Sequence, residues 1–244
     1  MNPSPPIGSG KFPSTRWTLL LAAGSQNQQQ SRDALETLCA TYWYPVYVYI
    51  RSQGHSREES QDLTQDFFTG ILSRQYFDLA SPERGRFRSF LLSSVKFFLA
   101  DQARASRAQK RGGGTAPLPF EILVDEESYL REASHNETPS RIFDRRWAQA
   151  LLDRVISRLR DEFSSHGRLE HFDRLKIFLL GQSDIPYSEL ATQLSTTEGA
   201  LKVSISRLRK RYRDLIRAEI ADTVADPSEV ESELRYLFDA LSRR

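Results

Sequence analysis

The sequence has very little sulfur and no long apolar run. One cysteine, Cys39, occurs in 244 residues, so no disulfide can form within the chain, and this usage is typical of a reducing cytosol. No stretch approaches the roughly 20 apolar residues of a membrane-spanning helix. The N-terminus has prolines and glycines where a secretory signal needs an unbroken apolar core. We therefore expect a cytoplasmic protein without membrane insertion.

The sequence also lacks the patterns of strands, metal sites and catalytic centres. No run of alternating β-branched residues occurs, which predicts an all-α fold. The four histidines have no convincing ligand spacing, and His166 and His171, five residues apart, would not share one helix face. No nucleophile motif is present. We predict no catalytic residue, no metal and no cofactor, and hence a protein that is not an enzyme.

The formal net charge is only +2, but charges of one sign are gathered into blocks along the chain. Positions 84–111 contain eight Lys or Arg and one acid, whereas positions 121–137 contain six acids and one Arg. A second basic block lies between positions 202 and 217. Cations gathered in this way are typical of a surface that binds a polyanion.

Residues 187–217 predict a helix, a tight turn and a second, longer helix. Apolar residues recur every three or four positions on both sides of a short polar segment at 195–197. Ser195 and Glu198 have capping-box spacing, and Thr197 is an equally good N-cap for the second helix. The outward face of that helix is basic. The pattern favours a helix-turn-helix that reads the major groove, and the alternative is a solvated amphipathic surface helix.

Two helices are predicted in the first third of the chain. In residues 31–53 apolar side chains recur with the period of a helix, and many of them are aromatic. Because Pro45 lies inside this segment, it is either one bent helix or two helices. In the second, residues 56–72, Ser56 and Glu59 form a capping box. Its apolar stripe includes Phe67, and an acidic stripe lies beside it. The acidic stripe is either solvated or a docking face for a basic partner.

Residues 86–111 predict a basic helix with an aromatic side chain, Phe97, off its apolar stripe. Cations can hold a phosphate backbone while an exposed ring stacks on unpaired bases. The alternative is a core helix with solvated ends. Beyond it, Gly, Pro and acidic residues mark a linker.

We therefore predict two helical domains joined by a polar linker, the second containing the helix-turn-helix. The expected parts are a lead with a short helix (1–30), a first domain (31–111), the Gly, Pro and acid-rich linker (112–140), a second domain (141–217) and an acidic C-terminal helical extension (218–244).

Three motifs in this order resemble a known family. They are DLTQDFF, FRSFLLSSVKFFLADQARASRAQKR and, after the linker, YSELATQLSTTEGALKVSISRLRKR. Together they are similar to bacterial RNA polymerase sigma factors of the extracytoplasmic-function group, over residues 31–111 and 141–217. The resemblance implies a subunit that binds core RNA polymerase, directs it to specific promoters and helps open the DNA to start transcription.

The resemblance also implies roles for individual residues. The loop 76–86 stands where family members capture a flipped base. Polymerase contacts would come from Asp62, Gln65, Asp66 and Phe67, although the apolar stripe makes Phe67 a core residue in the alternative. Contacts with the minus-ten element would come from Arg86, Arg88, Lys96, Phe97, Gln102, Arg104 and Arg107. Contacts with the minus-thirty-five element would come from Thr197, Glu198, Gly199, Lys202, Val203, Ser206 and Arg207.

The chain departs from the family in three places. Residues 171–190, HFDRLKIFLLGQSDIPYSEL, are only loosely similar to the segment through which the family meets the polymerase flap. The family's turn usually contains glycine, where this chain has Leu194, Ser195 and Thr196. The family's minimal form has no counterpart of residues 222–244, and we expect this tail either to pack on the second domain or to mask its basic helix until a signal arrives. An anti-sigma factor or another regulator is a further candidate partner. The alternative function is a stand-alone helix-turn-helix DNA-binding transcriptional regulator.

Overall fold

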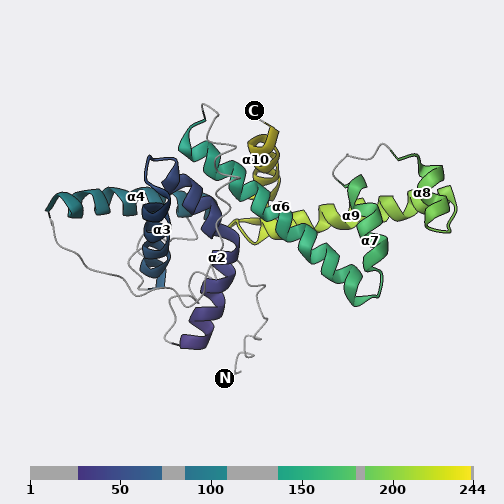
Figure 1. Ribbon diagram of the computed structural model, residues 1–244, viewed down its shortest axis with the longest axis horizontal. Helices are drawn as coiled ribbons and strands as arrows, with labels where there is room; N and C mark the ends of the chain where they lie inside the picture. Colours follow the sequence, from purple (N-terminus) through teal and green to yellow (C-terminus); the bar gives the residue numbers. More distant parts are fainter. Residues whose placement is uncertain (1–26, 73–85, 109–136, 180–184, 243–244) are drawn as a thin grey trace, which may run out of the picture.

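The computed structural model describes residues 27–72, 86–108, 137–179 and 185–242. Within these ranges all regular secondary structure is helical and no strand occurs, which confirms the all-α prediction. Figure 1 shows the arrangement. The helices are α2 (Gln28–Arg51), α3 (Arg57–Leu72), α4 (Phe87–Ala108), α6 (Pro139–Ser165), α7 (Leu169–Leu175), η3 (Lys176–Phe178), α8 (Tyr187–Gln193), α9 (Glu198–Ala221), η4 (Pro227–Glu229) and α10 (Val230–Ser242).

Local signals fix the starts of the first helices. Asn27 caps α2 because its side chain accepts hydrogen bonds from the backbone N–H groups of Gln29 and Gln30. Pro45 lies inside α2, which is one continuous helix rather than two. The predicted capping box before α3 is confirmed: the Ser56 hydroxyl accepts from the Glu59 N–H at 3.1 Å, and the Glu59 carboxylate accepts from the Ser56 N–H at 2.9 Å.

Aromatic rings fill the space between α2, α3 and α4. Trp43 of α2 stacks on Phe68 of α3 with ring centroids 5.6 Å apart, and Tyr42 of α2 meets Phe87 of α4 at 5.1 Å. All four side chains are buried. Cys39 lies in the same core, where burial raises the pKa of its thiol and keeps it protonated.

The long helix α6 packs on both halves of the chain (Figure 1). Towards its N-terminal end, Phe143 meets Tyr49 of α2 edge to face at 6.4 Å. Near its C-terminal end, Phe163 packs on Phe172 of α7 at 5.5 Å. The buried apolar side chains of both halves consequently form one contiguous cluster. The division into two domains joined by residues 112–140 stays a prediction, because most of that segment lies outside the described residues.

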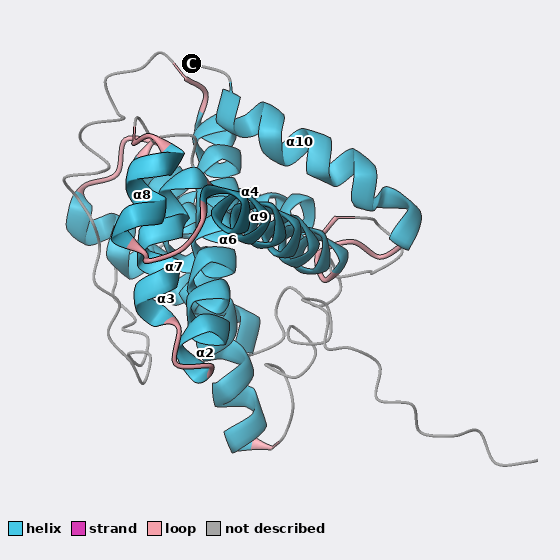
Figure 2. Ribbon diagram, turned by 90° about the vertical axis from the view of Figure 1, so that its right-hand side faces the viewer, coloured by secondary structure: helices cyan, strands magenta, loops and turns pink. Residues whose placement is uncertain are grey.

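The C-terminal extension folds back onto this core. Residues 230–242, which lie within the predicted helical extension, form an amphipathic helix, α10, in which Leu234 and Leu237 are buried. It packs against α6 and α9, and Figure 2 shows it lying along one side of the molecule. Its buried face also carries a charged residue, Glu233, whose partners are described below.

Candidate nucleic-acid interface

A tight turn joins α8 to α9. The chain reverses at Ser195, which has a positive φ of 50°, and the Thr196 N–H donates to the Ala191 carbonyl at 2.9 Å. Thr197 then caps α9, since its hydroxyl oxygen accepts from the Ala200 N–H at 3.2 Å. Of the two caps that the sequence allowed, the structure has Thr197. Ser195 instead supplies the left-handed turn residue.

The conformation of Ser195 gives a testable expectation. A left-handed conformation strains any residue with a Cβ by roughly 1–2 kcal/mol, whereas glycine adopts it freely but loses more entropy on folding. We expect Ser195→Gly to raise the free energy of unfolding by about 0.5 kcal/mol and Ser195→Ala to give no gain, measured by urea denaturation. An equal gain from both variants would show that φ at this position is not what limits stability.

The residues predicted to read the minus-thirty-five element lie together at the start of α9. Their side chains are exposed, including Val203, an apolar residue that is 50% exposed. A Cβ added at Gly199 would meet nothing within 4 Å, so the space in front of this turn is open. The set that the structure brings together is Thr197, Glu198, Gly199, Lys202, Val203, Ser206 and Arg207.

Lys202 is positioned by two neighbours. Its ammonium group lies 2.6 Å from the Glu198 carboxylate and 5.6 Å from the ring centroid of Tyr187. The hydrogen bond to Glu198 raises the pKa of Lys202, so the amine stays charged. A phosphate or a guanine edge could replace Glu198 as its partner, because both accept hydrogen bonds from lysine.

Farther along α9 much of the basic surface is tied to the protein itself. Arg209 donates to the carbonyl oxygen of Phe178 at 3.2 and 3.0 Å. Arg211 forms a two-pronged pair with Glu162, and Arg217 pairs with Glu231 of α10. These arginines tie α9 to η3, α6 and α10.

A second exposed surface lies on α4 from Lys96 onward. Lys96, Gln102 and Arg104 are exposed there. Phe97 is 47% exposed, whereas its neighbour Phe98 is buried in the core. Arg104 donates to the Ala100 carbonyl at 3.2 Å and lies 3.7 Å from Asp101. Arg107 is in the last turns of the same helix.

The structure places Arg86 and Arg88 elsewhere, beneath α10. Arg88 is 6% exposed, with Nε 2.6 Å from a Glu233 oxygen and Nη1 3.0 Å from Asp144 of α6. Its guanidinium lies 3.6 Å from the ring centroid of Tyr236. Arg86 also reaches Glu233, at 3.0 Å. Arg88, predicted to contact DNA, does not face solvent in this structure, because two acids and a ring enclose it.

Burial and ion pairing shift the pKa of Arg88 in opposite directions. Burial alone would lower the pKa of Arg88, but the hydrogen bonds and negative charges of Glu233 and Asp144 outweigh it and raise the pKa. The Tyr236 hydroxyl donates to Asp144 at 2.5 Å. Arg88 therefore stays charged within a cluster in which each polar group has a partner.

The residues predicted to contact polymerase are divided between surface and core. Asp62 of α3 is exposed, and Gln65 and Asp66 are partly exposed. Phe67 is fully buried, with its ring 5.8 Å from that of Phe98. The sequence allowed Phe67 to be either a polymerase contact or a core residue, and in the structure it lies in the core. The loop 76–86 falls outside the described residues except for Arg86.

Sequence reasoning missed the buried acids Asp144, Glu219 and Glu233. Glu219 of α9 lies 3.4 Å from Arg154 and 3.6 Å from Arg158 of α6, which ties the end of α9 to the middle of α6. A signal was present for Glu233, which stands three residues after Val230 and four before Leu237 on the apolar face of its helix. A charge on an apolar face predicts a buried partner of opposite sign.

The described residues offer no metal-binding group of three or more His, Cys, Asp or Glu side chains. None of the helices in these ranges is both long and apolar enough to cross a membrane. No family model, no curated protein and no solved structure matches the chain.

Proposed function

We propose that this chain is a promoter-specificity subunit of bacterial RNA polymerase, similar to an extracytoplasmic-function sigma factor. The observation that carries the proposal is the presence of two separate exposed surfaces of the required chemistry. One is the polar and cationic start of α9, and the other is the stretch of α4 from Lys96 to Arg104, with Phe97 at its surface.

In this proposal α8, the turn at Ser195 and α9 are a helix-turn-helix. The first turns of α9 enter the major groove, where Lys202 and Arg207 donate hydrogen bonds to guanine or phosphate. Asp62 and its neighbours on α3 form the acidic surface that meets the polymerase. The protein performs no chemistry of its own and contributes binding energy and position.

The exposed face of α4 would hold the opened minus-ten element. Unstacking DNA costs a few kcal/mol per step, and an aromatic side chain recovers about 1–3 kcal/mol for each base that it stacks. Phe97 supplies the ring, while Lys96 and Arg104 supply charge for the backbone.

Arg86 and Arg88 join this surface only if α10 moves, because Glu233 of α10 pairs with both guanidinium groups. We infer that the chain as described is a closed form, in which the acidic helix α10 takes the place of DNA phosphates at the start of α4. The tail masks a basic surface in this account, but the surface belongs to α4 rather than to α9.

One observation favours the second candidate function, a stand-alone DNA-binding regulator. Phe67 and Arg88 are buried, which removes a residue each from the polymerase and minus-ten surfaces, whereas all the predicted residues on α9 are exposed. A regulator would need only the α9 surface.

Transcription in vitro separates the two functions. We expect core polymerase with this protein to initiate at defined sites in a genomic fragment library, and to lose those starts when Lys202 and Arg207 are both changed to Ala. Each lost contact to a base edge should cost about 1–3 kcal/mol. Lys176→Ala is the matched control, since Lys176 is a half-exposed lysine paired with Asp173 on the short helices before α8.

If the protein alone binds duplex fragments tightly but neither binds polymerase nor supports initiation, the sigma proposal is wrong and the protein is a stand-alone regulator. Initiation unaffected by the double substitution would remove α9 as the reader in either case.

A further inference from the structure

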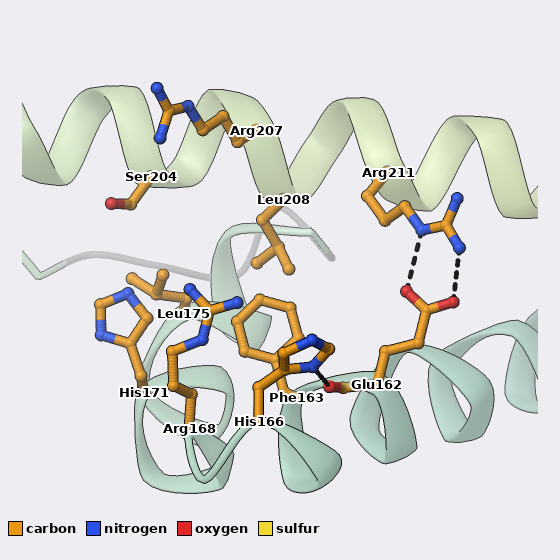
Figure 3. Close-up of a pocket in the computed structure, with 10 residues that line it drawn as sticks. All are labelled: Glu162, Phe163, His166, Arg168, His171, Leu175, Ser204, Arg207, Leu208 and Arg211. Carbon is orange, nitrogen blue, oxygen red and sulfur yellow. Dashed lines mark hydrogen bonds and ion pairs between the residues drawn. The ribbon is translucent and has the colours of Figure 1, made fainter.

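A cavity of about 530 Å³ lies beside the middle of α9, where the end of α6, the loop after it and α7 face that helix. Figure 3 shows the side chains that line it. Phe163, Leu175 and Leu208 form its apolar part, and the remaining lining residues are mostly cationic or imidazole side chains. Pockets for small molecules typically have about 300–1,000 Å³, so this cavity has the size of a ligand site.

The one acid that lines the cavity is already neutralised. Arg211 donates to the two oxygens of Glu162 at 2.8 and 2.5 Å, and the hydrogen bond from Arg211 lowers the pKa of Glu162. The His166 ring nitrogen Nδ1 lies 2.6 Å from the Glu162 backbone oxygen (Figure 3). Glu162 is therefore not available to balance other cations at this site.

Three further groups, Arg168, His171 and Arg207, line the same cavity without an acidic partner among the described residues. Arg168 is held in place by Phe163, since its guanidinium carbon lies 5.2 Å from the centroid of that ring. Figure 3 shows Arg168 between the two histidines, with Arg207 across the cavity on α9. The two arginines, one on each wall, leave the cavity with unbalanced positive charge.

We propose that this cavity binds a small phosphorylated molecule, with its phosphate held by Arg168 and Arg207 and hydrogen-bonded by His171. Guanidinium groups match phosphate oxygens in geometry and charge. Arg168 lies in the loop before α7 and Arg207 lies on α9, so the anion would bridge that loop and α9. The apolar part of the cavity would receive the uncharged part of the ligand.

Binding of the phosphorylated molecule does not depend on the proposed function. An effect of this ligand on DNA binding does depend on it, because Arg207 also belongs to the surface proposed to enter the major groove. A ligand that engages Arg207 would compete with DNA and so link transcription to the level of a phosphorylated metabolite.

Titration calorimetry of the full chain with inorganic pyrophosphate, at an ionic strength held constant with sodium chloride and without DNA, tests the proposal. We expect saturable binding that weakens about 10-fold or more in Arg168→Gln and in Arg207→Gln, since a charge-assisted hydrogen bond is lost in each. The control is Arg213→Gln, an exposed arginine of α9 that does not line this cavity. Circular dichroism verifies that each variant is folded.

If pyrophosphate shows no saturable binding, the proposal is overturned. It is also overturned if Arg213→Gln weakens binding as much as the two cavity variants do, because the anion would then be attracted to exposed cations in general. A second titration uses dimethyl phosphate, a singly charged diester like the DNA backbone. Binding of dimethyl phosphate as tightly as pyrophosphate would identify a backbone contact and overturn the small-ligand site, whereas clear preference for pyrophosphate supports it.

Discussion

Replacing Glu233 by glutamine is expected to lower the free energy of unfolding by about 3 kcal/mol. Glu233 is fully buried and pairs with both Arg86 and Arg88, and Arg88 is itself 6% exposed. Removal of one charge from a buried pair leaves the other without compensation in a medium of low polarity. The loss should stay near the lower end of the usual range because Asp144 still faces Arg88.

Urea denaturation followed by circular dichroism measures this change, and Glu231→Gln is the matched control. Glu231 is an acid on the same helix that pairs with Arg217, but both side chains are more than half exposed. An exposed pair contributes at most about 1 kcal/mol. Similar losses in the two variants would contradict the account of a buried cluster, and so would an unchanged stability in Glu233→Gln.

Phe97 and Phe98 are expected to give opposite results when each is changed to alanine. Phe98 is buried against Phe67, so Phe98→Ala should cost about 3–5 kcal/mol of stability. Phe97 is 47% exposed, so Phe97→Ala should change stability little. If Phe97 stacks on a base, its loss should weaken binding of single-stranded promoter DNA by about 1–3 kcal/mol.

The two variants are compared by urea denaturation and by fluorescence titration with a single-stranded minus-ten oligonucleotide in the presence of core polymerase. A folded Phe97→Ala protein with undiminished DNA binding would remove the aromatic role of α4. Loss of stability in Phe97→Ala comparable to that in Phe98→Ala would mean that the ring is part of the core.

Patterns within one helix were sufficient to predict much of this fold. The box formed by Ser56 and Glu59 placed the start of α3, and the apolar stripe identified Phe67 as a core alternative before any coordinates. The exposed position of Phe97 followed from its place off the stripe of α4. Such features depend on the helical repeat and on neighbours three or four residues away.

The partners of Arg88 could not be predicted in the same way. Glu233 and Asp144 are distant in sequence, and their approach depends on how α10 and α4 pack against α6. The cations of residues 86–111 predicted a single DNA-binding surface. In the structure Arg86 and Arg88 lie in the cluster beneath α10, whereas Lys96 and Arg104 are exposed. The cavity between α7 and α9 likewise exists only through packing.

Helix α6 packs on both halves of the chain, so its length fixes the distance between them. Its 27 residues form a rod of about 40 Å, close to the rise of about 12 base pairs of DNA. Because its two ends are packed into different parts of one core, the rod cannot bend between them without separating buried surfaces. If the protein contacts two DNA elements as proposed, this rod would hold the two DNA-binding surfaces at a constant separation, and the protein would select promoters by the interval between the elements.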